Sequence, residues 1–124
     1  MTTVLDKLRF KPGMRVCVLD APAGFQAELA SLPTSVERAK ALRGELDLVH
    51  VFVTRLAQLT PRLSKVKGAL KAGGILWVSY PKADGLSTDL NRDVLRRALA
   101  KRGLQAVANV AVDEVWSAVR FKKC

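Results

Sequence analysis

The chain has 124 residues, of which 49% are hydrophobic and 26% are charged, and its formal net charge is +10. This composition is typical of one globular domain, expected over residues 1–124, and excludes a disordered or fibrous chain. The longest apolar runs fall well short of the roughly 18 residues that cross a bilayer, so no membrane segment is expected.

The first half of the chain alternates predicted helices and strands. The elements in order are a helix over residues 4–10, a strand over 14–19, a turn over 20–24, a helix over 25–32 and a strand over 46–53. Residues 34–41 fit either a short edge strand around Val36 or irregular structure. The strand over 46–53 has the strongest signal because apolar and β-branched residues dominate it.

The second half continues the alternation. The elements in order are a turn over residues 55–59, a helix over 61–70, a strand over 75–80, a helix over 89–101, and a hairpin of strands over 104–112 and 115–121. Apolar residues recur at spacings of three and four between residues 56 and 70, which marks one helical face. Thr60 as N-cap and Pro61 as first helical residue would fit that helix. Thr88 or Ser87 is expected to cap the helix over 89–101.

The stretch over residues 70–82 is the most informative part of the chain. Leu70-Lys71-Ala72-Gly73-Gly74 predicts a helix end followed by a glycine turn, because glycine takes the left-handed conformation without strain. The continuous apolar run that follows is typical of a strand covered on both faces.

This pattern predicts an α/β fold with three layers: a Rossmann-like, mostly parallel sheet that ends in a C-terminal antiparallel hairpin strand. Right-handed crossovers would place the helices after Val53 and Tyr80 on one face and the helix after Asp20 on the other. A topological switch point then falls between the strands ending at Leu19 and Val53. Ligands of such sheets bind at that point.

Three stretches of the second half carry a resemblance to known proteins. They are WVSYPK, TDLNRD and AVDEVWSAVRF, at residues 77–82, 88–93 and 111–121. With the order of the elements, they resemble a family of short bacterial proteins of unknown function that have a shortened class I methyltransferase-like fold. The resemblance covers nearly the whole chain and implies a methyltransferase-like domain without an assigned activity.

The resemblance also implies where S-adenosylmethionine would bind. In working enzymes a strand-ending acid and an x-Gly-x-Gly turn meet its methionine part, and a second strand-ending acid takes the ribose hydroxyls. Asp20 matches the first acid and Gly24 a later glycine, but Pro22 replaces the first glycine and has no N–H. No acid follows Val36 where the second is expected. We therefore predict no cofactor and no methyl transfer, and S-adenosylmethionine is the candidate to test.

Polar residues gather where the predicted strands end. They form a candidate ligand-binding crevice of Asp20, Gly24, Tyr80, Lys82, Thr88, Asn91, Arg92, Asp113 and Trp116. The N-terminus of the helix after Thr88 would favour an anion, so a small anionic or amphipathic ligand is expected. Several of these residues also have a structural interpretation, such as a helix cap for Thr88 and a core anchor for Trp116.

No catalytic residue and no metal site are predicted. His50, the only histidine, lies mid-strand and is expected to be buried and neutral. Cys17, in a core strand, and Cys124, the last residue, are a poor disulfide pair. Residues 1–7 lack a secretory signal pattern, so a cytoplasmic location is expected.

The excess of positive charge supports a second hypothesis. Two basic helices are predicted on one face, with candidate nucleic-acid contacts at Arg62, Lys65, Arg92, Arg96 and Arg97. Such a face suits nucleic acid or an acidic partner. The alternative is a solvated surface, because no exposed aromatic residues are interleaved for base stacking. A sheet edge could pair with a second copy, but nothing in the sequence decides the oligomeric state.

Overall fold

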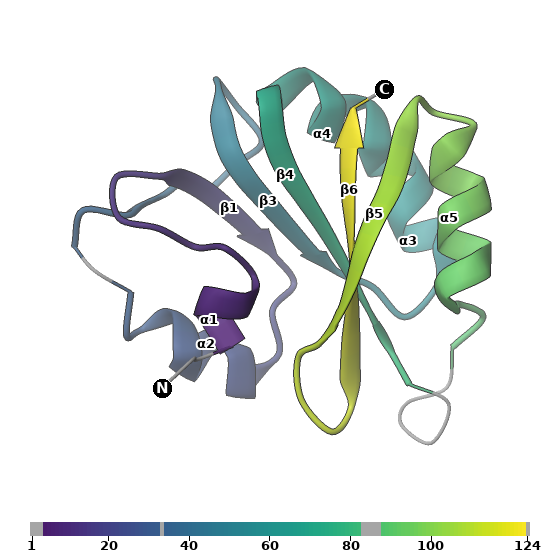
Figure 1. Cartoon of the computed structure of the whole chain (residues 1–124), viewed down its shortest axis with the longest axis horizontal. Helices are drawn as coiled ribbons and strands as arrows, with labels where there is room; N and C mark the ends of the chain where they lie inside the picture. Colours follow the sequence, from purple (N-terminus) through teal and green to yellow (C-terminus); the bar gives the residue numbers. More distant parts are fainter. Residues whose placement is uncertain (1–3, 33, 83–87, 124) are drawn as a thin grey trace.

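The computed structural model describes residues 4–32, 34–82 and 88–123. Within them, six strands form one sheet in the order β2-β1-β3-β4-β6-β5 (Figure 1). The strands are β1 (Arg15–Leu19), β2 (Glu37–Arg38), β3 (Leu46–Phe52), β4 (Leu70–Pro81), β5 (Leu104–Ala111) and β6 (Trp116–Lys123). The helical segments are α1 (Val4–Lys7), α2 (Ala23–Leu29), α3 (Leu56–Leu59), the 3-10 turn η1 (Thr60–Arg62), α4 (Leu63–Ala69) and α5 (Arg92–Ala100).

The sheet topology confirms the predicted architecture. β2, β1, β3 and β4 run parallel to one another, and β6 is antiparallel to both β4 and β5. The chain moves from β1 to β2 and returns on the other side of β1 as β3, so the switch point lies between β1 and β3. β1, β3, β4 and β5 therefore end along the same edge of the sheet, which we call the carboxyl edge. The undecided stretch over residues 34–41 contains the short strand β2.

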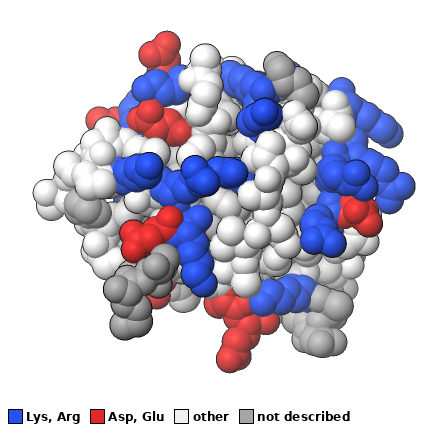
Figure 2. Space-filling view, in the orientation of Figure 1, with Lys and Arg blue, Asp and Glu red and all other residues white. Residues whose placement is uncertain are grey.

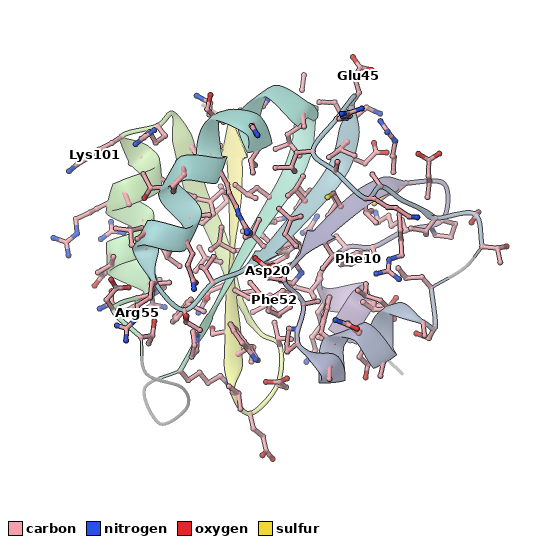
Figure 3. The ribbon with its side chains drawn as sticks, turned by 180° about the vertical axis from the view of Figure 1, so that it is seen from behind. Phe10, Asp20, Glu45, Phe52, Arg55 and Lys101 are labelled. Carbon is pink, nitrogen blue, oxygen red and sulfur yellow. The ribbon has the colours of Figure 1, made fainter. Side chains whose placement is uncertain are left out.

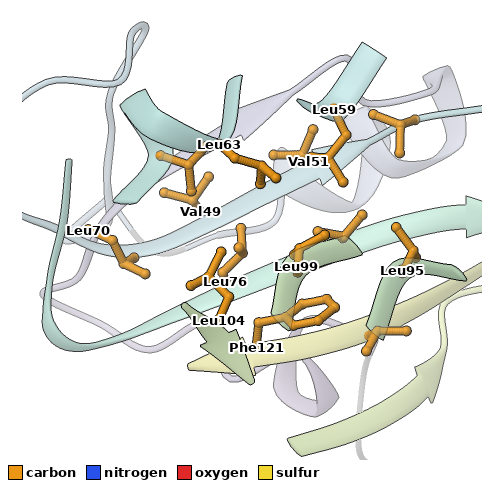
Figure 4. Packing of buried hydrophobic residues seen from close by; sticks show 14 of the residues in the cluster. Val49, Val51, Leu59, Leu63, Leu70, Leu76, Leu95, Leu99, Leu104 and Phe121 are labelled. Atoms are coloured by element: carbon orange, nitrogen blue, oxygen red, sulfur yellow. The ribbon is translucent and has the colours of Figure 1, made fainter. Parts of the chain in front are cut away.

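The helices cover the two faces as the handedness of the crossovers predicts. The first apolar cluster joins α3, α4 and α5 to one face of the sheet (Figure 4) through residues that include Leu59, Leu63, Val66, Leu95 and Leu99. The second cluster joins α1 and α2 to the other face through Leu5, Leu8, Phe25 and Leu29. None of the described helices is long and apolar enough to cross a membrane.

Burial on both faces explains why apolar residues point to both sides of the central strands. In β3, Leu48 and Phe52 belong to the second cluster, whereas Val49 and Val51 belong to the first. Trp77 of β4 is buried in the second cluster and its indole Nε1 donates to the Leu8 carbonyl at 2.7 Å. That hydrogen bond holds the segment after α1 against the sheet.

The glycine stretch over residues 70–74 differs from its prediction. α4 ends at Ala69, and its C-cap Leu70 is extended at φ −82°, so no left-handed glycine ends this helix. Residues 71–74 lie in a register irregularity of β4 instead, and Gly73 adopts φ +77° there. A Cβ at Gly74 would come within 2.8 Å of the Leu70 side chain. The two glycines therefore shape a bulge in the strand.

The helix starts also differ from their predictions. α5 begins at Arg92, and Asn91 is its N-cap, with its side-chain oxygen accepting from the Val94 N–H at 2.8 Å. The predicted cap Thr88 lies too early for that role, and Ser87 lies outside the described residues. The Thr60 hydroxyl donates to the carbonyl of Leu56 rather than capping a helix, because the chain is already helical there.

Candidate ligand-binding edge

The predicted crevice residues do not face one common pocket. Tyr80 packs against the first apolar cluster, on the α5 side of the sheet. Trp116 packs in the second cluster, where its ring meets Phe52 at a centroid distance of 5.2 Å. The register explains this: Tyr80 pairs with Ser117, and neighbouring side chains on a strand point to opposite faces. The prediction that Tyr80 and Trp116 line one pocket is wrong.

Lys82 and Asp113 come together at the hairpin tip. Lys82 donates to the Asp113 carbonyl through Nζ at 2.6 Å and to the Val115 carbonyl through its N–H at 2.7 Å. The Asp113 Oδ1 accepts from the N–H groups of Val115 and Trp116, each at 2.8 Å. These side chains fasten the β5–β6 turn to the end of β4.

The residues that precede α5 fasten it to the end of β3. The Thr88 hydroxyl donates to the Thr54 carbonyl at 2.6 Å and accepts from the Leu90 N–H at 3.0 Å. The Asp89 carboxylate accepts from the Leu56 N–H at 3.0 Å, which satisfies the start of α3. With Asn91 engaged as the α5 cap, the polar groups here hold residues 88–91 in place. Arg92 is exposed in the first turn of α5.

Asp20 lies at the switch point. It ends β1 in the left-handed conformation at φ 58°, which Asp tolerates better than most residues. Its Oδ2 lies 2.6 Å from Arg62 Nη1. Figure 3 places Asp20 at the end of β1, beside the layer of α3 and α4. Both partners of this ion pair are more than a third exposed, so the pair contributes little to stability and can open.

The turn after β1 offers few of the contacts that S-adenosylmethionine requires in the enzymes the chain resembles. Pro22 is the N-cap of α2 and has no N–H to donate. A Cβ at Gly24 would meet no atom within 4 Å, so packing does not require a glycine there. After β2, the chain continues through Ala39, Lys40 and Ala41 with no carboxylate for a ribose. Asp20, the matching acid, is paired with a guanidinium.

A cavity of about 540 Å³ opens at the carboxyl end of β1. Its lining residues are Leu19, Ala41, Leu42, Arg43, Arg62 and Lys65. The volume falls in the range of roughly 300–1,000 Å³ that is usual for small-molecule sites. Three of these residues are apolar and three are cationic, and no carboxylate is among them. The cavity joins two members of the predicted basic face, Arg62 and Lys65, to the switch point.

Sequence reasoning missed Arg43 and its apolar neighbours. They follow β2, in a stretch with no periodicity, so no element placed them near β1. In the structure, the Arg43 carbonyl accepts from Arg15 Nη1 at 3.1 Å, and Leu42 packs against the first cluster. These contacts bring the loop beside Leu19.

The titratable groups of the core have structural roles. His50 is fully buried, and its Nε2 lies 2.6 Å from the Ser79 hydroxyl. Burial lowers the pKa of His50 to about 3, which confirms a neutral core histidine. Burial also raises the pKa of the Cys17 thiol, so the thiol is a poor nucleophile. Among the described residues, no three His, Cys, Asp or Glu side chains group to hold a metal ion.

The basic helical face is formed by η1, α4 and α5, which share one side of the sheet. Lys65, Arg92, Arg96 and Arg97 are exposed on it. Arg96 is 3.2 Å from the Asp93 carboxylate. On the same side, a cavity of about 360 Å³ is lined by Leu63, Ser64, Lys67, Lys101 and Arg102. Figure 3, which shows this side, places Lys101 at its outer margin.

Comparison with known proteins identifies the fold. No family model matches the sequence, and no curated protein does. Among solved structures, a methyltransferase dependent on S-adenosylmethionine from Aquifex aeolicus matches with a TM-score of 0.67 and 16% identity, over 95% of this chain and 86% of that one. The glycopeptide N-methyltransferase MtfA, solved with sinefungin, matches with a TM-score of 0.61 and 12% identity, over 97% of this chain and 90% of that one.

LepI, solved in complex with S-adenosylmethionine, matches with a TM-score of 0.57 and 20% identity. The match covers 98% of this chain but 39% of LepI, so the chain spans well under half of that protein. At these identities the likeness establishes the fold and leaves the activity open. The chain therefore has a shortened methyltransferase-like fold of the Rossmann type.

Proposed function

We propose that the chain is a cytoplasmic methyltransferase-like module that binds a small anionic, partly apolar ligand and does not transfer methyl groups. The observation that carries this proposal is the cavity at the carboxyl end of β1, which combines apolar walls with Arg43, Arg62 and Lys65. It adjoins the switch point, where sheets of this type bind their ligands.

The charges around the cavity favour an anion. Of its three cations, Arg62 has a carboxylate partner, Asp20, and that ion pair is exposed. Arg43 and Lys65 are exposed and have no carboxylate partner among the described residues. A ligand phosphate or carboxylate would gain charge-assisted hydrogen bonds from these groups. Leu19 and Leu42 would meet its apolar part.

The same charges disfavour S-adenosylmethionine. Its sulfonium carries a positive charge, which the three cations would repel. Pro22 and the missing acid after β2 remove two of the contacts that the resemblance implies. We therefore propose that the fold is retained as a binding scaffold and that the transferase activity is absent.

Calorimetric titration tests this proposal with a matched pair of probes, adenosine 5′-monophosphate and uncharged adenosine. We expect saturable binding of the monophosphate, little binding of adenosine, and no heat above dilution for S-adenosylmethionine or S-adenosylhomocysteine. A variant with Arg62→Gln and Lys65→Gln should bind the monophosphate more weakly than the wild type, whereas Arg97→Gln on α5 should bind it as the wild type does. Tight binding of S-adenosylhomocysteine, or equal binding of the monophosphate by both variants, would contradict the proposal.

A second candidate function is binding of nucleic acid or an acidic partner by the basic helical face. The observation that favours it is the cavity between α4 and α5, which has Lys67, Lys101 and Arg102 in its lining and no acid. The affinity for single-stranded RNA should then fall steeply as the salt concentration rises. Lysine and arginine side chains that bind phosphates displace the counterions condensed on the RNA, and added salt opposes that release. A flat salt response, or no loss of affinity on changing Lys101 and Arg102 to Gln, would remove this candidate.

A further inference from the structure

Two arginines meet on the face of the sheet that is opposite to α4 and α5. Arg120 of β6 pairs with Trp77 of β4, and directly opposed residues share a face, so Arg120 lies on the α1 side. The hydrogen bond from Trp77 to the Leu8 carbonyl brings the next residue, Arg9, to the same place. Arg9, Arg120 and Lys122 line one cavity of about 410 Å³.

The positive charge of this cavity has no ion-pair partner among the residues that the structure describes. No carboxylate is among its lining residues, and the other side chains that form its walls include Ile75 and Val107. Val107 is 39% exposed, and it is the one exposed large hydrophobic residue in the described part of the chain. In Figure 2, which shows this face, blue side chains gather across the middle of the surface.

Arg120 is also incompletely hydrogen-bonded. Its Nε is buried and has no hydrogen-bond partner among the described residues. Burial and the nearby charge of Arg9 both lower the pKa of the Arg120 guanidinium. A buried donor without a partner and two neighbouring like charges are each unfavourable, and a bound anion would relieve both.

The backbone at Arg9 supports the same conclusion. Arg9 follows α1 in the left-handed conformation at φ 67°, where glycine is the favoured residue. Its N–H donates to the Asp6 carbonyl at 3.0 Å, so the helix end fixes this conformation. Arginine is an unfavourable residue for this backbone conformation, and a role in binding would explain why it stands there.

We propose that Arg9, Arg120 and Lys122 form an oxyanion site that binds a phosphate group. Guanidinium groups match the geometry of phosphate through paired N–H donors, and the lysine adds a point charge. Ile75 and Val107 give the site an apolar wall for the rest of the ligand. The site lies on the other face of the sheet from α4, which contributes to the β1 cavity, so it is independent of the function proposed above.

Nuclear magnetic resonance of the arginine Nε–H groups tests this site with inorganic phosphate at constant ionic strength. We expect saturable shifts at Arg9 and Arg120 and no such shift at Arg96, which is paired with Asp93. Arg9→Gly should weaken binding about tenfold or more, as expected for one lost charge-assisted hydrogen bond. This variant suits the left-handed backbone, so it should fold. Shifts that chloride reproduces, or unchanged affinity in Arg9→Gly, would overturn the proposal.

Two further arms identify the source of the phosphate and separate this site from the first one. A short single-stranded oligonucleotide with a 5′-phosphate and the same oligonucleotide without it are titrated in parallel. Stronger binding of the phosphorylated strand supports a phosphomonoester, and equal binding supports a phosphodiester. The Arg120 shift should persist in the variant with Arg62→Gln and Lys65→Gln. Its loss there would assign the response to the β1 cavity and overturn the second site.

Discussion

The buried histidine makes stability depend on pH in a direction that can be calculated. Burial lowers the pKa of His50 to about 3 from an ordinary value of 6.5. The unfolded chain takes up a proton as the pH falls through 6.5, whereas the folded chain does not do so until about pH 3. The contribution to stability is therefore fully present above pH 6.5 and is lost progressively below it.

The size of the effect follows from the interval in pH. Each pH unit below 6.5 costs about 1.4 kcal/mol, so lowering the pH to 5 should cost about 2 kcal/mol of unfolding free energy. The ordinary pKa values of carboxyl groups, near 4, lie below this interval. Urea unfolding at pH 7 and pH 5 measures the difference. His50 is the only histidine in the sequence, so the assignment is direct.

A double variant is the matched control. His50→Phe together with Ser79→Ala removes both partners of the 2.6 Å contact between His50 Nε2 and the Ser79 hydroxyl. The new phenyl ring keeps the stacking on Phe52, whose ring centroid lies 4.4 Å from that of the imidazole. Replacing both partners removes the imidazole nitrogens and the hydroxyl together, so neither position keeps an unpaired buried polar group, and the variant should fold. Its stability should be nearly equal at pH 7 and pH 5. The reasoning is refuted if the wild-type chain is equally stable at pH 7 and pH 5. It is also refuted if the variant loses as much unfolding free energy as the wild type does between these pH values.

Further predictions concern stability at specific positions. Gly74→Ala should cost about 1–3 kcal/mol in urea unfolding, because its Cβ would come within 2.8 Å of Leu70, whereas Gly24→Ala should be neutral or stabilising by up to about 1 kcal/mol. Gln58→Ala should cost about 1 kcal/mol, because its side-chain oxygen accepts from the N–H groups of Thr54 and Arg55 at the start of α3; an unchanged midpoint contradicts this. Arg9→Gly should raise stability by about 1 kcal/mol, because glycine tolerates φ 67°; a loss of stability contradicts it.

The architecture could be predicted because hydrophobic periodicity and the handedness of crossovers determine it. The continuous apolar run over residues 75–78 of β4 indicated a strand buried on both faces. The structure confirms this, since Leu76 and Val78 belong to the first cluster and Trp77 to the second. The exact ends of the helices were harder to predict. Asn91 and Thr88 are both good capping residues, and the contact of Thr88 with the Thr54 carbonyl decides between them.

The candidate site could be predicted only in part. Sequence places side chains at the ends of strands but does not give the register of β4 and β6, so Tyr80 and Trp116 were assigned to one pocket although they lie on opposite faces. Arg43 was missed because it lies in a loop without periodicity. Arg120 was missed as a possible binding residue because only the fold brings it to Arg9.

The most direct test of the account follows the methyl resonances of Leu19 and Leu42, which form the apolar wall of the β1 cavity. Adenosine 5′-monophosphate should shift both signals in a saturable way and leave the signal of Leu99, a buried residue of α5, unchanged. S-adenosylhomocysteine should shift neither. If the monophosphate leaves the Leu19 and Leu42 signals unchanged, an anion-binding role for this edge of the sheet is contradicted. Saturable shifts with S-adenosylhomocysteine would contradict it as well.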